Sequence, residues 1–225
     1  MYSDLSIIIP SAGPGRRIRS YGPKALMEIN NETLIERQVR VLSTCFPGAQ
    51  IIAVLGFEAE KIEKVLPPFV DVVHNNDFET SNISLSIKIA TEKSENNKCL
   101  YVYGDLVFDS GWFPPLNQSW TIYDTKNQLP KDNVGITNNS GYVTNFSYGL
   151  PNKWGQVTYL ENLELDIFKK AYKENRSEKL FGFELLNKVI HHGGLIRATE
   201  PNEMVIFEID SIKDLQKARE HCEKY

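Results

Sequence analysis

The residues that could do chemistry begin in a glycine-, proline- and arginine-rich loop, which follows an apolar run at residues 5–10. Residues 7–26 read IIIPSAGPGRRIRSYGPKAL and contain Gly13, Gly15, several arginines and Lys24. Glycines let a backbone approach a phosphate closely and turn its N–H groups inward. Several arginines with a lysine favour a larger negative charge, such as the β- and γ-phosphates of a nucleoside triphosphate.

Two familiar phosphate-binding patterns do not fit this loop. A dinucleotide fingerprint needs a third glycine and an acidic residue about 20 positions further on, and a Walker loop needs G-x-x-x-x-G-K-[ST]. A plain tight turn remains the structural alternative, because a G-x-G pair alone is weak evidence for a ligand.

Acidic side chains supply a second candidate site. Asp105 lies at the carboxyl end of the apolar run 98–108, where an uncompensated carboxylate is costly. On a strand, Glu208 and Asp210 point to one face while Ile209 points away. Two neighbouring carboxylates repel each other unless a cation lies between them, so a metal ion is favoured here. For Asp105 alone, a turn or helix-cap role is the alternative.

The loop, with A-G-x-G-x-R followed shortly by P-K, resembles the nucleotide-binding signature of the sugar-nucleotide pyrophosphorylase and cytidylyltransferase superfamily. The resemblance implies that Ala12 and Gly13 contact base and sugar through the backbone, with Gly15 beside them. It also implies that Arg17 binds the triphosphate and that Lys24 neutralises charge at the α-phosphate. Arg16 falls at a variable position of the signature and is a further nucleotide-binding candidate.

The same resemblance extends to the acidic positions. It implies that the G-D pair at Gly104 and Asp105 holds Mg²⁺, and that Glu208 and Asp210 complete the metal site before a D-L helix. Mg²⁺ is therefore the expected cofactor. The expected catalytic residues are Arg17, Lys24 and Asp105.

Residues 75–90, NNDFETSNISLSIKIA, resemble a stretch of the choline-phosphate cytidylyltransferase-like subgroup. Ser81, Asn82 and Ser86 are polar positions of that match. Asn82 and Ser86 are four residues apart, so they share a face at a helix start and could read a pyrimidine edge. The alternative is a simple cap for the helix expected at 83–93.

Acceptor residues fall where the resemblance is weak, in KWGQVTYL and FGFELLNKVI. Large aromatic side chains could line a pocket for a cationic group, although such residues are more often part of a core. The acceptor candidates are Trp112, Trp154 and Glu184, and Trp120 and Tyr148 are further aromatic ones.

Strands and helices alternate along the first half of the chain. Strands are expected at 5–10, 49–57, 70–76 and 98–108, and helices at 32–45, at 58–66 before Pro67 and Pro68, and at 83–93. The second half predicts strands at 133–139, 142–150, 155–163, 195–201 and 204–210, and helices at 165–179, 182–192 and 211–225. The expected fold is α/β and three-layer Rossmann-like (GT-A-like). It has a mixed, mainly parallel sheet and a small β/α lobe over its carboxyl edge.

We expect one nucleotidyltransferase domain over 1–225, with an NTP-binding half at 1–109 and an acceptor-binding, sheet-completing half at 110–225. A net charge of −4 argues against a general nucleic-acid binder. No apolar run approaches the roughly 20 residues that cross a bilayer, and no signal peptide is evident. A cytoplasmic protein without a membrane partner is therefore expected, and an oligomer is left open.

These features together predict a Mg²⁺-dependent nucleotidyltransferase. It would join an NTP, expected to be CTP, to a phosphorylated acceptor such as phosphocholine or a sugar 1-phosphate, and release pyrophosphate. The product would serve surface polysaccharide or lipid precursor synthesis. One alternative is a glycosyltransferase of related fold, but Asp105 and Asp109 are four apart and do not form D-x-D. The other is a non-catalytic nucleotide-binding domain.

Overall fold

The computed structural model describes residues 1–15, 22–108, 113–124, 133–201 and 205–223. Its described residues form a large mixed sheet of nine strands in the order β5-β4-β1-β6-β11-β8-β12-β10-β9. The first four strands in this order are mutually parallel. They are β5 (Asp71–His74), β4 (Gln50–Leu55), β1 (Leu5–Pro10) and β6 (Lys98–Val102).

The second half of the chain extends the same sheet. Its strands are β11 (Asn152–Glu161), β8 (Trp120–Asp124), β12 (Arg197–Thr199), β10 (Tyr142–Tyr148) and β9 (Val134–Asn139). Strand β11 runs antiparallel to β6 and β8, and β10 runs antiparallel to β12 and β9. The expected α/β class with a mixed sheet is confirmed, and β10 and β11 are the strands that run against the rest.

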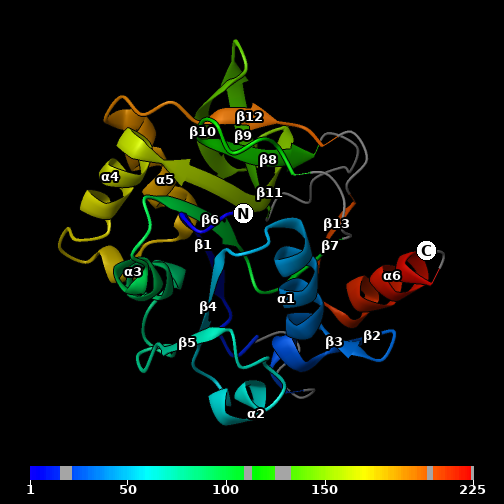
Figure 1. Ribbon diagram of the computed structural model, residues 1–225. Coiled ribbons are helices and arrows are strands. Elements are labelled where there is room, and N and C mark those ends of the chain that lie inside the picture. The colour runs from blue at the N-terminus through cyan, green and yellow to red at the C-terminus, as the bar shows by residue number, and fades with distance from the viewer. Residues whose placement is uncertain (16–21, 109–112, 125–132, 202–204, 224–225) are drawn as a thin grey trace.

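Helices cover both faces of the sheet, which gives three layers (Figure 1). On one side lie α3 (Ile83–Lys93), α4 (Asn162–Ala171) and α5 (Gly182–His191). On the other side lie α1 (Leu34–Cys45) and α6 (Ile212–Cys222), and the short α2 (Ala59–Glu63) lies beyond β5. The central strand β1 is buried along its whole length, as a strand covered on both faces must be.

Two of the three hydrophobic clusters among the described residues lie on opposite faces of β1, because side chains alternate across this strand. Leu5, Ile7 and Ile9 pack toward α1, whereas Ile8 packs toward α3. All four side chains are fully excluded from solvent. This apolar anchoring holds the end of β1, and hence the start of the glycine-rich loop, at a defined place on the sheet edge.

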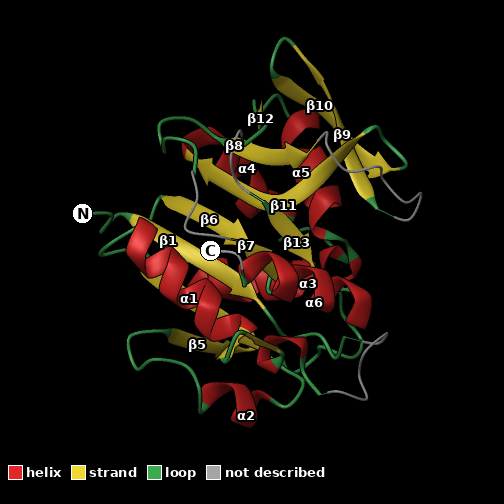
Figure 2. Cartoon of the chain, turned by 90° about the vertical axis from the view of Figure 1, so that its right-hand side faces the viewer, coloured by secondary structure: helices red, strands yellow, loops and turns green. Residues whose placement is uncertain are grey.

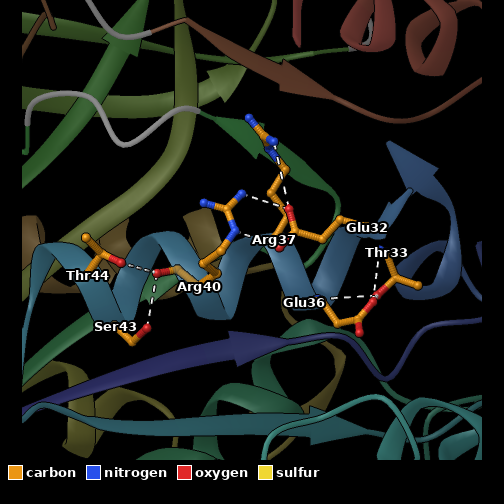
Figure 3. Close-up of polar contacts among 7 residues, drawn as sticks. All are labelled: Glu32, Thr33, Glu36, Arg37, Arg40, Ser43 and Thr44. Carbon is orange, nitrogen blue, oxygen red and sulfur yellow. Dashed lines mark hydrogen bonds and ion pairs between the residues drawn. The ribbon is translucent and has the colours of Figure 1, made fainter. Parts of the chain in front are cut away.

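Helix α1 shows why the sequence starts a helix where it does. Thr33 and Glu36 form a reciprocal capping box, in which each side chain bonds the other residue's backbone N–H (Figure 3). Glu32 meanwhile accepts both Nε–H and an NH2 proton of Arg40 at 2.7 Å. Apolar side chains at helical spacing then bury one face of the helix.

Two small sheets complete the described structure. Strands β2 (Glu28–Ile29) and β3 (Glu32–Thr33) form a hairpin before α1. Strand β7 (Leu106–Phe108) pairs antiparallel with β13 (Ile206–Glu208), and α6 lies beside them (Figure 2). This pairing brings the chain around residue 105 next to the chain around residue 208.

Several boundaries differ from those expected. The run 98–108 is not one strand, because it turns at 103–105 and its end, β7, leaves the main sheet for β13. Strand β8 was not expected, because its part of the sequence shows only weak hydrophobic periodicity. The helix expected at 58–66 ends at Glu63, and the one expected at 165–179 is α4, which begins and ends earlier. No helix among the described residues combines the length and apolar character needed to cross a membrane.

Candidate active site

A cavity of about 300 Å³ opens where β1 ends and α3 begins. Its walls include the glycine-rich loop, the start of α3 and the turn after β6. Every described residue predicted to bind the nucleotide lines this cavity, namely Ala12, Gly13, Gly15, Lys24, Ser81, Asn82, Ser86, Gly104 and Asp105. Arg16 and Arg17, together with the acceptor candidate Trp112, lie outside the described residues.

Gly104 holds the turn after β6 against the end of β1. A Cβ at this position would lie 2.0 Å from Ser11 Oγ and 2.8 Å from the Pro10 carbonyl oxygen. Only glycine permits so close an approach. Gly15 adopts a left-handed φ of +56°, and a Cβ there would meet Lys24 Cγ at 2.9 Å. The two glycines therefore bring the loop, Lys24 and Asp105 into one wall.

A polar network lies on the α3 side of this cavity. The Asn75 amide donates to Ser86 Oγ at 3.0 Å and to Ser81 Oγ at 3.2 Å. Asn75 is only 2% exposed, so its side chain is held in place. Sequence reasoning did not select Asn75, although it opens the N-x-x-F match that contains Ser81 and Asn82.

Asn82 occupies the N-cap position of α3 but makes no side-chain capping bond. Its amide donates instead to the Lys179 carbonyl, and its backbone N–H donates to the Glu178 carbonyl at 2.8 Å. The simple capping alternative for Asn82 is therefore wrong. The residue joins α3 to the 3-10 turn at Ser177–Lys179.

Three carboxylates lie close together next to the paired strands β7 and β13. One ligand oxygen each of Asp105, Glu208 and Asp210 lies within 4.8 Å of the others. Asp105 Oδ1 is buried and has no hydrogen-bond partner. A buried oxygen without a partner is costly unless a cation or water satisfies it. The oxygen donors and the orphaned oxygen fit a hard divalent cation such as Mg²⁺.

Lys24 lines the nucleotide cavity and forms ion pairs with two of these carboxylates. Its Nζ lies 2.8 Å from Asp210 Oδ1 and 3.1 Å from Asp105 Oδ2. Burial acts to lower the pKa of Lys24, but the charges of Asp105 and Asp210 outweigh it and raise that pKa. The lysine is therefore a permanent cation.

Glu208 is the least solvated of the three carboxylates. Burial, followed by the charge of Asp105, raises its pKa, while Lys153 and a hydrogen bond from Gln156 partly offset the rise. Lys153 Nζ lies 3.1 Å from Glu208 Oε2. Glu208 is thus held by cationic and polar groups from β11, whereas Asp105 and Asp210 are held by Lys24.

A second cavity, of about 210 Å³, lies on the other side of these carboxylates. Tyr103 and Ile83 line both cavities and separate them. Burial, and then the charges of Asp105 and Glu208, raise the pKa of Tyr103. The side chain between the two cavities is therefore a neutral phenol. The remaining lining residues are Asn133, Val134, Tyr148, Lys153, Trp154, Gln156, Phe181, Gly182, Phe183, Glu208 and Asp210.

The structure places the predicted acceptor residues in different environments. Trp154 lines the second cavity and donates through Nε1 to Thr121 Oγ1 at 2.9 Å, and the half-exposed Tyr148 lines it as well. Trp120 is 1% exposed and belongs to the core. Glu184 is not among the lining residues and instead accepts the Phe181 N–H at 2.6 Å at the start of α5. Its assignment to the acceptor site is therefore corrected to a helix cap.

Sequence reasoning missed Lys153, Gln156, Phe181 and Phe183 as members of the second cavity. Lys153 and Gln156 stand within the KWGQVTYL match, and Phe181 and Phe183 within FGFELLNKVI. Both stretches were therefore recognised as candidates for the acceptor site. Their individual cavity-lining residues could not be selected, because the cavity forms only where β11 and the start of α5 come together in the fold.

Comparisons with known proteins agree with this geometry. The model of the MobA-like NTP transferase domain matches residues 7–138. The bifunctional protein GlmU of Thermotoga petrophila is 35% identical over 101 residues, which are 44% of this chain and 22% of that protein. The chain thus spans about a fifth of the length of the curated relatives that head the comparison.

Solved structures share the fold over nearly the whole chain. The CTP:phosphocholine cytidylyltransferase of Streptococcus pneumoniae superposes with a TM-score of 0.82 at 20% identity, covering 97% of this chain and 99% of that one. The inositol-1-phosphate CTP transferase of T. maritima gives 0.78 at 19% identity, covering 100% and 96%. Likenesses at this level of identity establish the three-layer fold.

Proposed function

Since the chain belongs to the MobA-like NTP transferase domain family, we propose that it is a cytidylyltransferase that couples CTP to a small phosphorylated acceptor. One observation carries the proposal: a nucleotide-sized cavity and a second cavity meet at the carboxylates of Asp105, Glu208 and Asp210. A reaction between two phosphorylated substrates needs such a meeting point.

The reaction is an in-line displacement at the α-phosphorus of CTP. An oxygen of the acceptor phosphate forms a bond to that phosphorus, the bond to the β-phosphate oxygen breaks, and pyrophosphate leaves with the electron pair. No covalent enzyme intermediate is required, so the protein acts by positioning and charge neutralisation. The absence of a catalytic Cys or His from the described lining residues is consistent with this mechanism.

Each group of the site has a role in this scheme. Lys24 neutralises charge at the α-phosphate, and the backbone of the glycine-rich loop receives the triphosphate. Asp105, Glu208 and Asp210 would hold Mg²⁺, which would neutralise phosphate charge when bound. Arg17 is proposed to hold the leaving pyrophosphate, as the superfamily signature implies.

The polar network on α3 supports CTP as the nucleotide. Ser86 Oγ accepts from Asn75, which leaves the Ser86 O–H to donate to a base. The exposed edge of cytosine carries acceptors and an amine, which suits a mixed set of hydroxyls and amides. The two solved structures of similar fold described above are also named as CTP-using transferases.

The walls of the second cavity support an acceptor with a phosphate at one end and a cationic group at the other. Lys153 supplies a cation for the phosphate. Phe181 stacks on Phe183, and Tyr148 meets Phe183 edge-on, so several ring faces and edges gather there. Aromatic faces attract ammonium groups. We therefore propose a phosphocholine-like acceptor, and keep a sugar 1-phosphate as the alternative within the same reaction class.

Pyrophosphate release across four NTPs tests this proposal, with Mg²⁺ and either phosphocholine or glucose 1-phosphate. Release with CTP and phosphocholine, lost in Asp105→Asn and retained in the matched control Asp166→Asn on the exposed face of α4, is expected. Release only with the sugar phosphate would overturn the acceptor class. A glycosyltransferase would release no pyrophosphate, and a non-catalytic domain would show no turnover. The cytoplasmic location and the use of the product in polysaccharide or lipid synthesis stay predictions.

A further inference from the structure

Strand β11 is irregular at the point where it passes the second cavity. Trp154 pairs with Tyr123 of β8, and Thr158 pairs with Thr121, so the strand carries extra residues between these pairs. Gln156, within this bulge, has a φ of +57°. The left-handed region is unfavourable for a residue with a long side chain and is found where surrounding structure enforces it.

The bulge lies in the wall of the second cavity. Lys153, Trp154 and Gln156 all line this cavity, and the irregular stretch begins after Trp154. Bulges are common next to active sites. The backbone of Gln156 is also tied to the site, because its carbonyl accepts the Tyr103 N–H at 3.4 Å.

The Gln156 side chain connects this cavity to the carboxylate cluster. Gln156 and Glu208 both line this cavity, and the Gln156 side chain acts to lower the pKa of Glu208. An ionised carboxylate only accepts, so the amide NH₂ is the group of Gln156 that suits it. The same amide carries a second proton and an oxygen that can serve another partner in the cavity. Glu208 is held from the same strand by Lys153, at 3.1 Å.

We propose that Gln156 is a positioning residue for the acceptor, held in a left-handed conformation so that its amide lies between Glu208 and the acceptor phosphate. This inference rests on the proposed function, because it assigns the acceptor to the second cavity. Gln156 fixes the direction of Glu208 toward Asp105 and Asp210, and its remaining amide proton donates to the acceptor phosphate. The backbone strain is then part of the arrangement of the site.

Gln156→Gly separates this role from a structural one, because glycine adopts a left-handed φ without strain. The melting temperature of this variant is expected to equal or exceed that of the parent. Its kcat/KM for the acceptor is expected to fall about tenfold to a hundredfold, the loss of a hydrogen bond to a charged group, with the KM for CTP within about twofold. Its affinity for Mn²⁺ alone should fall about tenfold, because Glu208 loses its support.

Ser140→Gly is the matched control, since Ser140 also has a positive φ, of +51°, at the exposed turn between β9 and β10. It should change neither acceptor kinetics nor Mn²⁺ affinity. Gln156→Asn should recover part of the lost activity. An active parent whose Gln156→Gly variant keeps parental acceptor kinetics, or unfolds at lower temperature, overturns this inference alone. A parent that releases no pyrophosphate from CTP with any acceptor overturns the proposed function instead.

Discussion

Lys24 Nζ lies 2.8 Å from Asp210 Oδ1, although 186 positions separate the two residues in the chain. The same ammonium lies 3.1 Å from Asp105 Oδ2, so it contacts two of the three carboxylates that could hold a divalent cation. Both cations are attracted to the same negative charge and repel each other. The lysine and the metal ion therefore compete for the cluster until a nucleotide phosphate offers the lysine another anionic partner.

Lys24→Met tests this competition. Methionine keeps much of the length of the side chain but removes the charge, so the repulsion of a divalent cation is lost. Without nucleotide, Mn²⁺ should bind the variant about tenfold more tightly, while turnover with CTP should fall at least about a hundredfold. Mn²⁺ titration and pyrophosphate release measure the two effects. Weaker Mn²⁺ binding in Lys24→Met would mean that the lysine does not oppose the metal.

Mg²⁺ should stabilise the folded protein through the same carboxylates. A ligand that binds only the native state adds about 2.7 kcal/mol to its stability at a hundredfold excess over Kd. Thermal unfolding with and without Mg²⁺ should therefore show a rise in melting temperature for the parent. Asp105→Asn and Asp210→Asn should show little or no rise, whereas Asp166→Asn should behave as the parent. An equal rise in all four proteins would place the bound metal elsewhere.

Gly104→Ala should damage the nucleotide cavity through backbone packing. The added Cβ would lie 2.0 Å from Ser11 Oγ, which would have to rotate away, and 2.8 Å from the Pro10 carbonyl oxygen, which moves only with the backbone. We expect a loss of about 1–3 kcal/mol of stability and a raised KM for CTP. Denaturant unfolding and steady-state kinetics measure these changes. Adding Ser11→Ala should recover part of the stability, and no recovery at all would argue against this contact as the cause.

Asn187 on α5 should be needed for the wall of the second cavity. Its Oδ1 accepts the Phe146 N–H at 2.9 Å, and its Nδ2 donates to the Phe146 carbonyl at 2.8 Å. This pair of bonds fixes β10, which also carries Tyr148. Asn187→Ala should cost about 1–3 kcal/mol of unfolding free energy and raise the KM for the acceptor more than that for CTP.

Lys188→Ala is the control for this variant. Its side chain forms an ion pair with Glu174 at the surface, and such pairs contribute less than about 1 kcal/mol. Urea unfolding of the two variants should therefore separate them clearly. Similar losses in both would show that the Phe146 bonds are not the reason for the effect.

Local patterns in the sequence were sufficient for the strand and helix that frame the nucleotide cavity. The apolar run at 5–10 and the helical spacing at 83–93 predict β1 and α3 with the observed bounds. The acidic positions could also be paired in advance, because the family resemblance implies that Asp105, Glu208 and Asp210 share one metal site. The proximity of Asp105 to Glu208 and Asp210 follows from the pairing of β7 with β13.

Features that depend on long-range pairing could not be read from the sequence. Strand β8 is short and flanked by residues without periodicity, and it is stabilised by β11 and β12, which come later in the chain. The bulge that contains Gln156 is a register shift between β11 and β8, two strands that lie apart in the sequence. Glu184 was misassigned because a helix cap and an acceptor ligand require the same residue type.

The most direct test of the central claim is a stoichiometric measurement with CTP, Mg²⁺ and phosphocholine. Pyrophosphate and a cytidine diphosphate-linked product should form in equal amounts with the parent, and neither should form above background with Lys24→Met or Asp210→Asn. Release of inorganic phosphate or CMP without a linked product, or unchanged turnover in both variants, would contradict the assignment of the reaction to the cluster between the two cavities.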